Sequence, residues 1–437
     1  MRGTRSRFAI KKIVAGLALF YCGCNQSKSL HICGCKDTTK KRKTENGKLS
    51  KKLLPLREAW SKFTPPTAKA VIKLKLTYTV AVALLALALT SCGGGKHTSA
   101  QADAAIDSAS IELGPQRLRL LFAGDAMCHM PQVESACNED GSLDFRPSLE
   151  GVKSYFDQAD IAVVNLETTI SPNSNHSGYP RFASPAEFAD ALAWLGTDVA
   201  LLANNHCCDK GAKGVRATIA KLDTLGIAHT GAFHSKEDYE KNNILRFERN
   251  GIKLSLINYT YGTNGNPIPK SCIVNLIDTV QIANDIALAL NGADCVVACM
   301  HWGYEYQRKP APSQRQLAKF LHRHGVDIVV GAHPHVIQPN TASEEQITIY
   351  SLGNFISNQQ DRYADGGLLA EIEVEKVNDS LCKYSLRTIP VWVKKNPGHK
   401  LISAEFASEE EMSDTQRTLY NRFISDTERL LKKGVKF

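Results

Sequence analysis

From Gln116 onward the sequence alternates between short apolar runs and segments with helical spacing, and this alternation is the strongest constraint on its fold. The runs at 294–300 and 326–330 are almost continuously apolar. Such runs fit strands that are buried on both faces of a mainly parallel sheet. Parallel strands need long crossover connections, and the helical segments between the runs fit that role. The sequence therefore predicts an α/β protein built from successive βα units.

The expected elements fall in one continuous stretch of the chain. We expect strands at 118–123, 160–166, 198–203, 252–259, 294–300, 326–330, 346–356 and 367–374, and helices at 184–195, 214–225, 280–290 and 312–325. We find no internal repeat and no second core, so one domain is predicted over residues 116–395. A charged helical tail is expected at 396–437. The length of 437 residues and the hydrophobic content of 43% are sufficient for such a core.

The charge of the chain is unevenly distributed. Residues 1–91 carry 19 Lys and Arg against 3 Asp and Glu, whereas residues 92–437 carry 34 against 41. The formal net charge of +9 therefore comes from the N-terminal segment, and residues 92–437 have a net charge of −7. A mildly acidic body argues against a general nucleic-acid-binding surface, so no nucleic-acid partner is expected.

Residues 71–92 have the pattern of a bacterial lipoprotein signal. Lys73 and Lys75 precede the apolar run 80–89, and small residues then lead to Cys92. The apolar run is well under the roughly 20 residues that a membrane span needs. Cleavage before Cys92 would leave a lipidated cysteine and a polar tether over 93–115, and would anchor the exported protein to a membrane of the cell envelope. The alternative, a short anchor that is never cleaved, stays open.

Residues 1–70 are basic and show little periodicity. We expect them either to lack a fold of their own or to be absent from the mature protein. Cys22, Cys24, Cys33 and Cys35 form two Cys-x-Cys pairs, but zinc sites usually place about two to four residues between paired cysteines, so no zinc site is expected there. Eight cysteines follow Cys92, several of them inside apolar runs, where a reduced thiol is an ordinary packing residue.

Metal-ligating residue types follow five of the expected strands. They are Asp125, Glu167, Asn205 with His206, His301, and His333 with His335. Because functional groups of open α/β sheets gather beyond the carboxyl ends of the strands, these side chains are expected to share one cavity. Two carboxylates, an amide oxygen and several imidazoles can hold two divalent cations, which would clamp the oxygens of a displacement reaction and activate water.

The order of these motifs carries a family resemblance. The motifs are Gly-Asp, Asn-Leu-Glu, Asn-Asn-His, His-Trp-Gly, Gly-Ala-His-Pro-His and Ser-Leu-Gly-Asn-Phe-Ile. From about Leu118 to Val393 the chain resembles the bacterial capsule-synthesis, or poly-γ-glutamate-synthesis (CapA-type), proteins, a branch of the calcineurin-like metallophosphoesterases. The resemblance implies a four-layered α/β sandwich with two central β-sheets. It also implies a role in the synthesis or export of an anionic envelope polymer, with that polymer, its precursors and other capsule-export proteins as expected partners.

The resemblance assigns roles to the clustered residues. A first metal would be bound by Asp125 and His335, a second by Asn205, His301 and His333, and Glu167 would bridge the two. His206 would donate a proton to the leaving group or steady the transition state.

The first motif of the superfamily is Asp-x-His, and this chain departs from it. Met127 occupies the histidine position, so the first metal is short of one ligand. His129 is not expected to replace that ligand, because a shift of two residues redirects the side chain. One or two divalent ions are therefore expected, and nitrogen and oxygen ligands suit Mn, Fe or Zn.

Three further residues are expected near the mouth of the cavity. Arg181 and Glu305 would contact substrate, and Asn354 would either contact substrate or support the ligands from behind. The leading hypothesis is a metal-dependent hydrolase acting on a phosphoester or an amide of an envelope polymer. The alternative is a non-catalytic component that binds the polymer and helps to export it. Met127 favours the alternative, whereas His206 disfavours it, because a pure binding site needs no proton donor.

Overall fold

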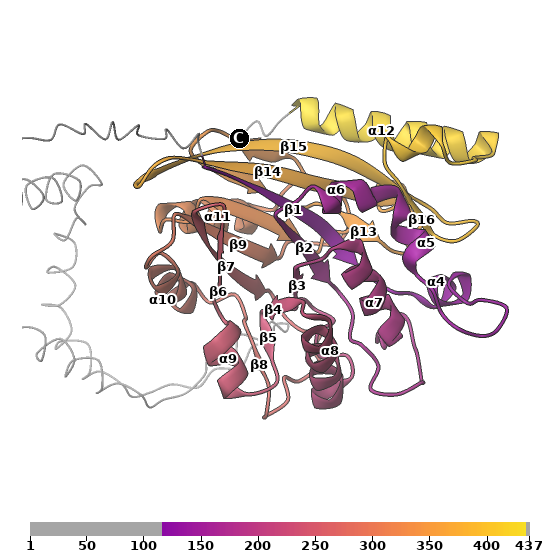
Figure 1. Cartoon of the computed structure of the whole chain (residues 1–437), viewed down its shortest axis with the longest axis horizontal. Coiled ribbons are helices and arrows are strands. Elements are labelled where there is room, and N and C mark those ends of the chain that lie inside the picture. Colours follow the sequence, from indigo (N-terminus) through magenta and orange to yellow (C-terminus); the bar gives the residue numbers. More distant parts are fainter. Residues whose placement is uncertain (1–115, 434–437) are drawn as a thin grey trace, which may run out of the picture. The chain divides into compact units, whose positions relative to one another are not determined.

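The computed structural model describes residues 116–433, and three β-sheets and the helices around them make up this region (Figure 1). The strands are β1 Gln116–Ala126, β2 Ile161–Leu166, β3 Val199–Leu201, β4 Ala228–Thr230, β5 Ala232–Phe233, β6 Leu245–Arg249, β7 Ile252–Thr260, β8 Ile273–Val274, β9 Cys295–His301, β10 Ile328–Ala332, β11 Asn340–Ala342, β12 Ile347–Ile349, β13 Asn354–Ile356, β14 Gly366–Asn378, β15 Leu381–Lys394 and β16 Lys400–Ile402. The helices are α4 Met130–Ser135, α5 Arg146–Leu149, η1 Glu150–Val152, α6 Lys153–Asp157, α7 Ala186–Leu195, α8 Gly211–Leu225, α9 Lys236–Asn242, α10 Thr279–Ala289, α11 Pro312–Arg323, η2 Phe406–Ser408 and α12 Asp414–Lys433.

Two large sheets form the centre of the described region. The larger has the strand order β16-β15-β14-β1-β2-β3-β4, with β13 pairing to β1, and the smaller has the order β11-β12-β10-β9-β7-β6. Each large sheet has a parallel part. It consists of β1 to β4 in the larger sheet, and of β7, β9, β10 and β12 in the smaller one. Antiparallel strands flank both parallel parts. The third sheet is the short antiparallel pair β5-β8.

Three hydrophobic clusters separate four layers. Alternate residues of β1 show how the layers arise, because successive side chains of a strand point to opposite faces. Leu120 belongs to the cluster between the two large sheets, whereas Leu121 belongs to the cluster under α7 and α8. On the far side of the smaller sheet, Ile286 and Leu321 of α10 and α11 pack against the strands. The four-layered α/β sandwich expected from the sequence is therefore confirmed.

The largest error in the expected elements concerns residues 346–356. We expected one strand, but β12 lies in the smaller sheet and β13 pairs with β1 in the larger one. The chain passes from one sheet to the other through residues 350–353, where Gly353 has a φ of +72°. The apolar pattern runs on across this crossing because both strands and the connection between them are buried.

The larger sheet continues beyond residue 395, where we expected the domain to end. β16 pairs with β15, and Tyr420 and Phe423 of α12 belong to the cluster between the two large sheets.

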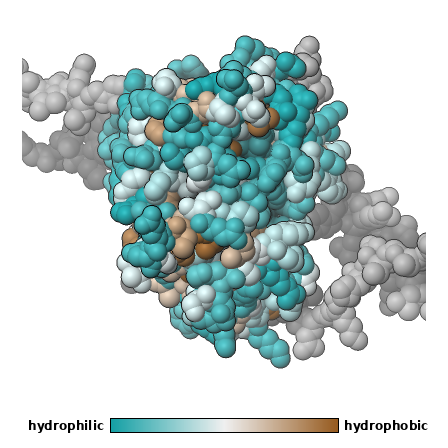
Figure 2. Space-filling model, turned by 90° about the vertical axis from the view of Figure 1, so that its right-hand side faces the viewer, coloured by the Kyte–Doolittle hydropathy of each residue, from teal (hydrophilic) through white to brown (hydrophobic). Residues whose placement is uncertain are grey.

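The N-terminal expectations lie outside the described residues: the basic stretch 1–70, the signal 71–92 with Cys92, and the tether 93–115. Within residues 116–433 no helix has both the length and the apolar character to cross a membrane. The face of the molecule in Figure 2 is mainly hydrophilic, with a few hydrophobic residues gathered near its middle.

Replacement of Gly124 by alanine is predicted to destabilise the fold. A Cβ atom at this position would lie 2.0 Å from the carbonyl oxygen of Gly353, so the two backbones would have to separate. We expect a loss of about 1–3 kcal/mol in the free energy of unfolding, the usual cost of overpacking, measured by urea titration. The matched control is Gly262→Ala, whose added Cβ would meet nothing within 4 Å. Equal stability of the two variants would contradict the prediction.

Candidate metal centre

The residues expected to bind metal lie together at the carboxyl ends of strands from both large sheets. Asp125 is near the end of β1, Glu167 directly follows β2, and Asn205 follows β3; His301 ends β9, and His333 and His335 follow β10. All six are buried, with exposed fractions of 0–3%. The crossing at residues 350–353 holds the two sheets in contact here, because the backbone N–H of Asp125 donates to the carbonyl oxygen of Gly353 over 3.0 Å.

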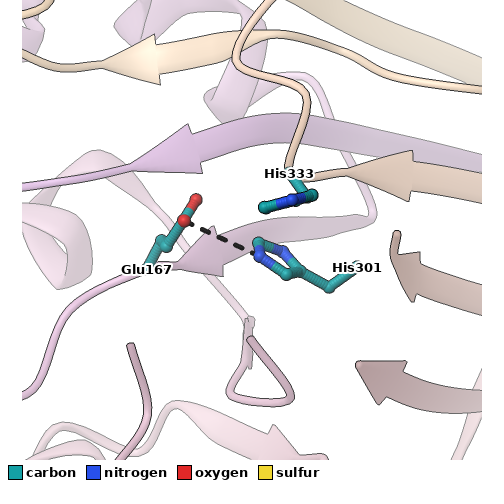
Figure 3. A group of neighbouring side chains, drawn as sticks. All are labelled: Glu167, His301 and His333. Carbon is teal, nitrogen blue, oxygen red and sulfur yellow. Dashed lines mark ion pairs between the residues drawn. The ribbon is translucent and has the colours of Figure 1, made fainter. Parts of the chain in front are cut away.

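Glu167 occupies the middle of the cluster. Its Oε1 atom is 3.6 Å from Nε2 of His301 and 3.8 Å from Nε2 of His335. The side chains of Glu167, His301 and His333 converge on one point (Figure 3). Their ligand atoms lie within 4.8 Å of one another, and the same holds for Asp125, Glu167 and His335. Glu167 is thus shared by two groups of potential ligands, which is the position of a bridging carboxylate.

Three buried atoms of the cluster have no hydrogen-bond partner within the described part of the chain. They are both carboxylate oxygens of Glu167 and Nδ1 of His333. Buried polar atoms are nearly always hydrogen-bonded, and a buried carboxylate without a partner is costly. A divalent cation would satisfy all three atoms, and carboxylate and imidazole are ligands that Mn, Fe and Zn accept. The residues present therefore fit a divalent metal ion.

The ionisation of the cluster also suits a cation. Burial, and then the charge of Asp125, raise the pKa of Glu167 well above its usual range. Burial, and then the neighbouring His333 and His335, lower the pKa of His301, and burial lowers the pKa of His333 to about 3. Both imidazoles are therefore neutral near pH 7, which is the form that binds metal. The positive charge that would stabilise an ionised Glu167 is left for an ion to supply.

Asp125 differs from Glu167 because the protein holds its charge in place. Burial disfavours ionisation of Asp125, but hydrogen bonds from His335 and Asn165 outweigh it, and the pKa falls below its ordinary value. Nδ2 of Asn165 donates to Oδ1 of Asp125 over 2.8 Å, and the backbone N–H of His333 lies 3.3 Å from both carboxylate oxygens.

His335 is oriented by two acceptors. Its Nδ1 atom lies 3.0 Å from Oδ2 of Asp125 and 3.1 Å from Oδ1 of Asn354, so Nδ1 carries the proton and Nε2 is left facing Glu167. Asn354 is fully buried and donates through Nδ2 to Gln359 and to the carbonyl of Ala364. Of the two roles considered for Asn354, support of a ligand from behind fits these contacts, and contact with substrate does not.

The loop that carries His333 and His335 has a strained backbone. Their φ angles are +95° and +57°, a region that non-glycine residues rarely adopt. Strain of this kind costs about 1–3 kcal/mol per residue and persists only where the surroundings enforce it. The loop is fixed by the backbone N–H of Tyr306, which donates to the carbonyl of Pro334 over 2.8 Å. The fixed backbone of this loop therefore positions the two imidazoles.

Asn205 and His206 face the cluster from the end of β3. Oδ1 of Asn205 lies 2.8 Å from Nε2 of His301. Nδ1 of His206 lies 2.7 Å from Oδ2 of Asp209, a fully buried side chain that also accepts from the backbone N–H of Phe182. The pair is the usual arrangement of a histidine held in one orientation by a carboxylate.

A cavity of about 250 Å³ opens over the cluster. Its lining includes Met127, His129, Tyr179, His206, Glu305, Tyr306 and His335. Glu305 is exposed, and a carboxylate oxygen of it lies within 4.8 Å of a ring nitrogen of His333 and of His335. Arg181 is also exposed, but it is not part of this lining. We find no support in the geometry for a substrate contact by Arg181.

The position of the missing first-motif histidine is visible in this lining. Met127 is buried and occupies it with a thioether side chain. His129 does not join either ligand group around Glu167; its Nδ1 atom lies 3.1 Å from Oε1 of Gln132 at the start of α4. His129 therefore lies in the cavity lining but outside both groups of potential ligands.

Two contributors were missed in the sequence. Asp209 comes three residues after His206, a spacing that brings side chains together in a helical turn and could have indicated the pair. Asn165 lies two residues before Glu167, so alternation along β2 and beyond it could have placed both on the same face. Neither residue type stands out alone, because Asp and Asn are frequent in loops.

The family of bacterial capsule synthesis proteins, PGA_cap, matches residues 119–359, and the chain belongs to this family. The capsule biosynthesis protein CapA of Bacillus anthracis is 36% identical over 259 residues, which cover 56% of this chain and 61% of that protein. The PGA biosynthesis protein CapA of Bacillus subtilis (strain 168) is 28% identical over 244 residues, covering 54% and 63%. The chain thus spans about three fifths of the length of these relatives.

Solved structures with a related arrangement are more distant. A putative 5'-nucleotidase from Staphylococcus aureus, crystallised with alpha-ketoglutarate, is 13% identical with a TM-score of 0.44, over 71% of this chain and 58% of that one. The 5'-nucleotidase from Candida albicans SC5314 is 9% identical with a TM-score of 0.40, over 72% and 57%. Likeness at this level does not transfer an activity to this chain.

Removal of single ligands is predicted to lower the metal content. After purification with Mn²⁺ or Zn²⁺, the wild-type chain should retain one or two ions. Glu167→Gln and His333→Ala should each lose at least one, because each changes a side chain with a buried atom that no group within residues 116–433 satisfies. Elemental analysis measures the content. The control is His324→Ala, which removes an exposed histidine of α11's C-terminal end. Equal metal content in all four proteins would contradict the assignment.

Proposed function

We propose that this chain is an exported, lipid-anchored protein of capsule or poly-γ-glutamate-like polymer synthesis, with a metal-dependent hydrolase site. The observation that carries the hydrolase part is Glu167, whose two oxygens have no partner among the described residues. They lie beside the neutral imidazoles of His301 and His333, which the smaller sheet supplies. Family membership supports the role in a capsule-type polymer. The names of two relatives, which refer to capsule and PGA biosynthesis, support an anionic envelope polymer or its precursors as the partner.

Seven residues would take part in such a site. Asp125, Glu167, Asn205, His301, His333 and His335 would hold one or two divalent ions, with Mn, Fe and Zn as the candidates. When bound, such ions act as Lewis acids on the scissile group and make water more acidic. His206 is left for proton transfer, since it lines the cavity and is not needed as a ligand.

Asp209 prepares His206 for that task. The hydrogen bond at Nδ1 leaves Nε2 as the atom that can give or take a proton in the cavity, where Nδ2 of Asn264 lies 3.4 Å away. His206 could therefore protonate the leaving oxygen of a phosphoester or the leaving nitrogen of an amide. The edge of Phe182 packs on the ring and limits its motion.

One observation favours a second candidate function, the binding and export of polymer without hydrolysis. Met127 fills the place of the first-motif histidine, so the ion bound by Asp125 and His335 would have fewer protein ligands. A site that holds one ion can bind an anionic group without cleaving it. The retained pair of His206 and Asp209 favours hydrolysis over this candidate.

Hydrolysis of a generic aryl phosphodiester tests the catalytic part. We predict that His206→Ala lowers kcat about 10²–10⁴-fold, the usual contribution of a general acid, while the metal content stays unchanged. Asp209→Asn should give a smaller loss. The control is His234→Ala, because His234 forms a similar pair with Asp238 that is remote from the cavity lining. Metal binding without turnover in any of these proteins would favour the polymer-binding candidate.

The lipid anchor is supported by the sequence pattern around Cys92 alone. Substitution of Cys92 by serine is predicted to move the protein from the membrane fraction to the soluble fraction, because the acceptor for acylation is lost. Cell fractionation with immunodetection measures this. An unchanged distribution would argue for an uncleaved anchor in its place.

A further inference from the structure

A second cavity, of about 230 Å³, lies between the end of β15, the segment after β13, and α12, which runs along β15 (Figure 1). Its lining includes Lys395, Arg422, Gln360, Asn396, Gln416 and Trp392. One carboxylate, that of Asp365, is also present, but it accepts from Nε1 of Trp392 over 3.1 Å. Two cations beside three amides suit a ligand that carries oxyanions.

The two cations of this cavity are left without ion pairs, unlike others nearby. Lys394 and Lys400 pair with Glu410, and Arg362 pairs with Asp426. Arg422, by contrast, is exposed and forms no ion pair or hydrogen bond with residues 116–433. Neither cation of this cavity therefore forms an ion pair within residues 116–433.

Lys395 is placed to gain from a bound anion. Its Nζ atom contacts only the carbonyl oxygen of Gln359 within the described region. Burial lowers the pKa of Lys395 to about 8, although Asp365 and Asp361 oppose the shift. A partly desolvated ammonium group without an ion-pair partner interacts strongly with an incoming anion.

Gln359 connects this cavity to the metal centre. Its carbonyl contacts Lys395, its Oε1 atom accepts from Asn354 over 2.9 Å, and its Nε2 atom donates to the hydroxyl of Tyr306 over 3.2 Å. Asn354 in turn orients His335. Gln359 lines the cavity of about 250 Å³ over the metal centre, which we call the catalytic cavity. The next residue, Gln360, lines the second cavity. A single segment of chain therefore separates the two.

The distribution of charge also favours a divided binding surface. Residues 92–437 have a net charge of −7, and the catalytic cavity is lined by Glu305 but by no Lys or Arg. A polyanion is repelled by such a body except where cations are concentrated. The second cavity supplies that local positive charge beside the metal centre.

We propose that the second cavity is a subsite for the oxyanion groups, carboxylate or phosphate, of an extended anionic polymer whose adjoining segment lies in the catalytic cavity. This inference rests on the proposed function, in that the polymer is the partner of the metal centre. Lys395 and Arg422 bind the anions, and the three amides donate further hydrogen bonds. Gln359, which contacts both Lys395 and Asn354, fixes the position of one cavity relative to the other.

The test measures binding of fluorescent probes to the full-length chain: an oligo-γ-glutamate, a polyphosphate of matched charge, and a neutral dextran. Wild type should bind at least one polyanion, more weakly as salt rises, and not the dextran. Arg422→Glu and Lys395→Gln should each raise the Kd at least about tenfold, as expected for loss of a charge-assisted hydrogen bond. The preferred probe shows whether carboxylate or phosphate is recognised.

The control is Arg429→Glu, which makes the same charge change on α12 at a residue that does not line the cavity. It should change the Kd less than about twofold. Equal effects of Arg422→Glu and Arg429→Glu, unchanged binding in both subsite variants, or no polyanion binding by wild type would overturn the proposal. Arg422 is exposed, so its variant also answers the question if Lys395→Gln fails to fold.

Metal content and aryl phosphodiester turnover, measured on the same proteins, separate this proposal from the proposed function. Arg422→Glu should keep both, because Arg422 does not line the catalytic cavity. If the wild-type protein shows no turnover but its polyanion binding still depends on Arg422, the proposed hydrolase activity is refuted and the proposed subsite stands.

Discussion

Two buried carboxylates that lack cationic partners are the constraint on which the rest of this structure depends. Asp125 and Glu167 are fully buried, and no Lys or Arg of the described region forms an ion pair with either. Burial of such a pair is unfavourable unless positive charge or hydrogen bonds compensate it. The protein provides hydrogen bonds for Asp125 only. Glu167 remains uncompensated, and the arrangement is favourable when a cation completes it.

The presence of two large sheets explains how the six candidate metal ligands come to lie in one place. Each sheet delivers ligands from the carboxyl ends of its own strands, and the tight approach of Gly124 to Gly353 holds the sheets together beside Asp125. The backbone at His333 and His335 has positive φ angles and is strained. Contacts in the surrounding fold keep it in this conformation. Stability is thus given up locally to orient the ligands, a trade common at functional sites.

The fold and the clustering of the candidate ligands could be predicted because strand ends have strong sequence signals. Buried parallel strands appear as apolar runs, and all six residues expected as ligands lie together. Residues whose role depends on another side chain were harder: Asp209 is recognised only once His206 is placed, and Asn165 only by its hydrogen bond to Asp125. The change of sheet within 346–356 was missed, because burial on both sides hides the crossing. The subsite cations lie directly after β15 and on α12, outside the motifs named in the sequence.

The central claim is that Glu167, His301 and His333 share a divalent cation. Anomalous X-ray diffraction from crystals of the full-length protein grown with Mn²⁺ tests this most directly, because the signal locates the ion without reference to activity. The account predicts a peak within bonding distance of a carboxylate oxygen of Glu167 and of a ring nitrogen of each histidine. No peak at this position, with ordered ligands and Mn²⁺ in excess, would contradict it.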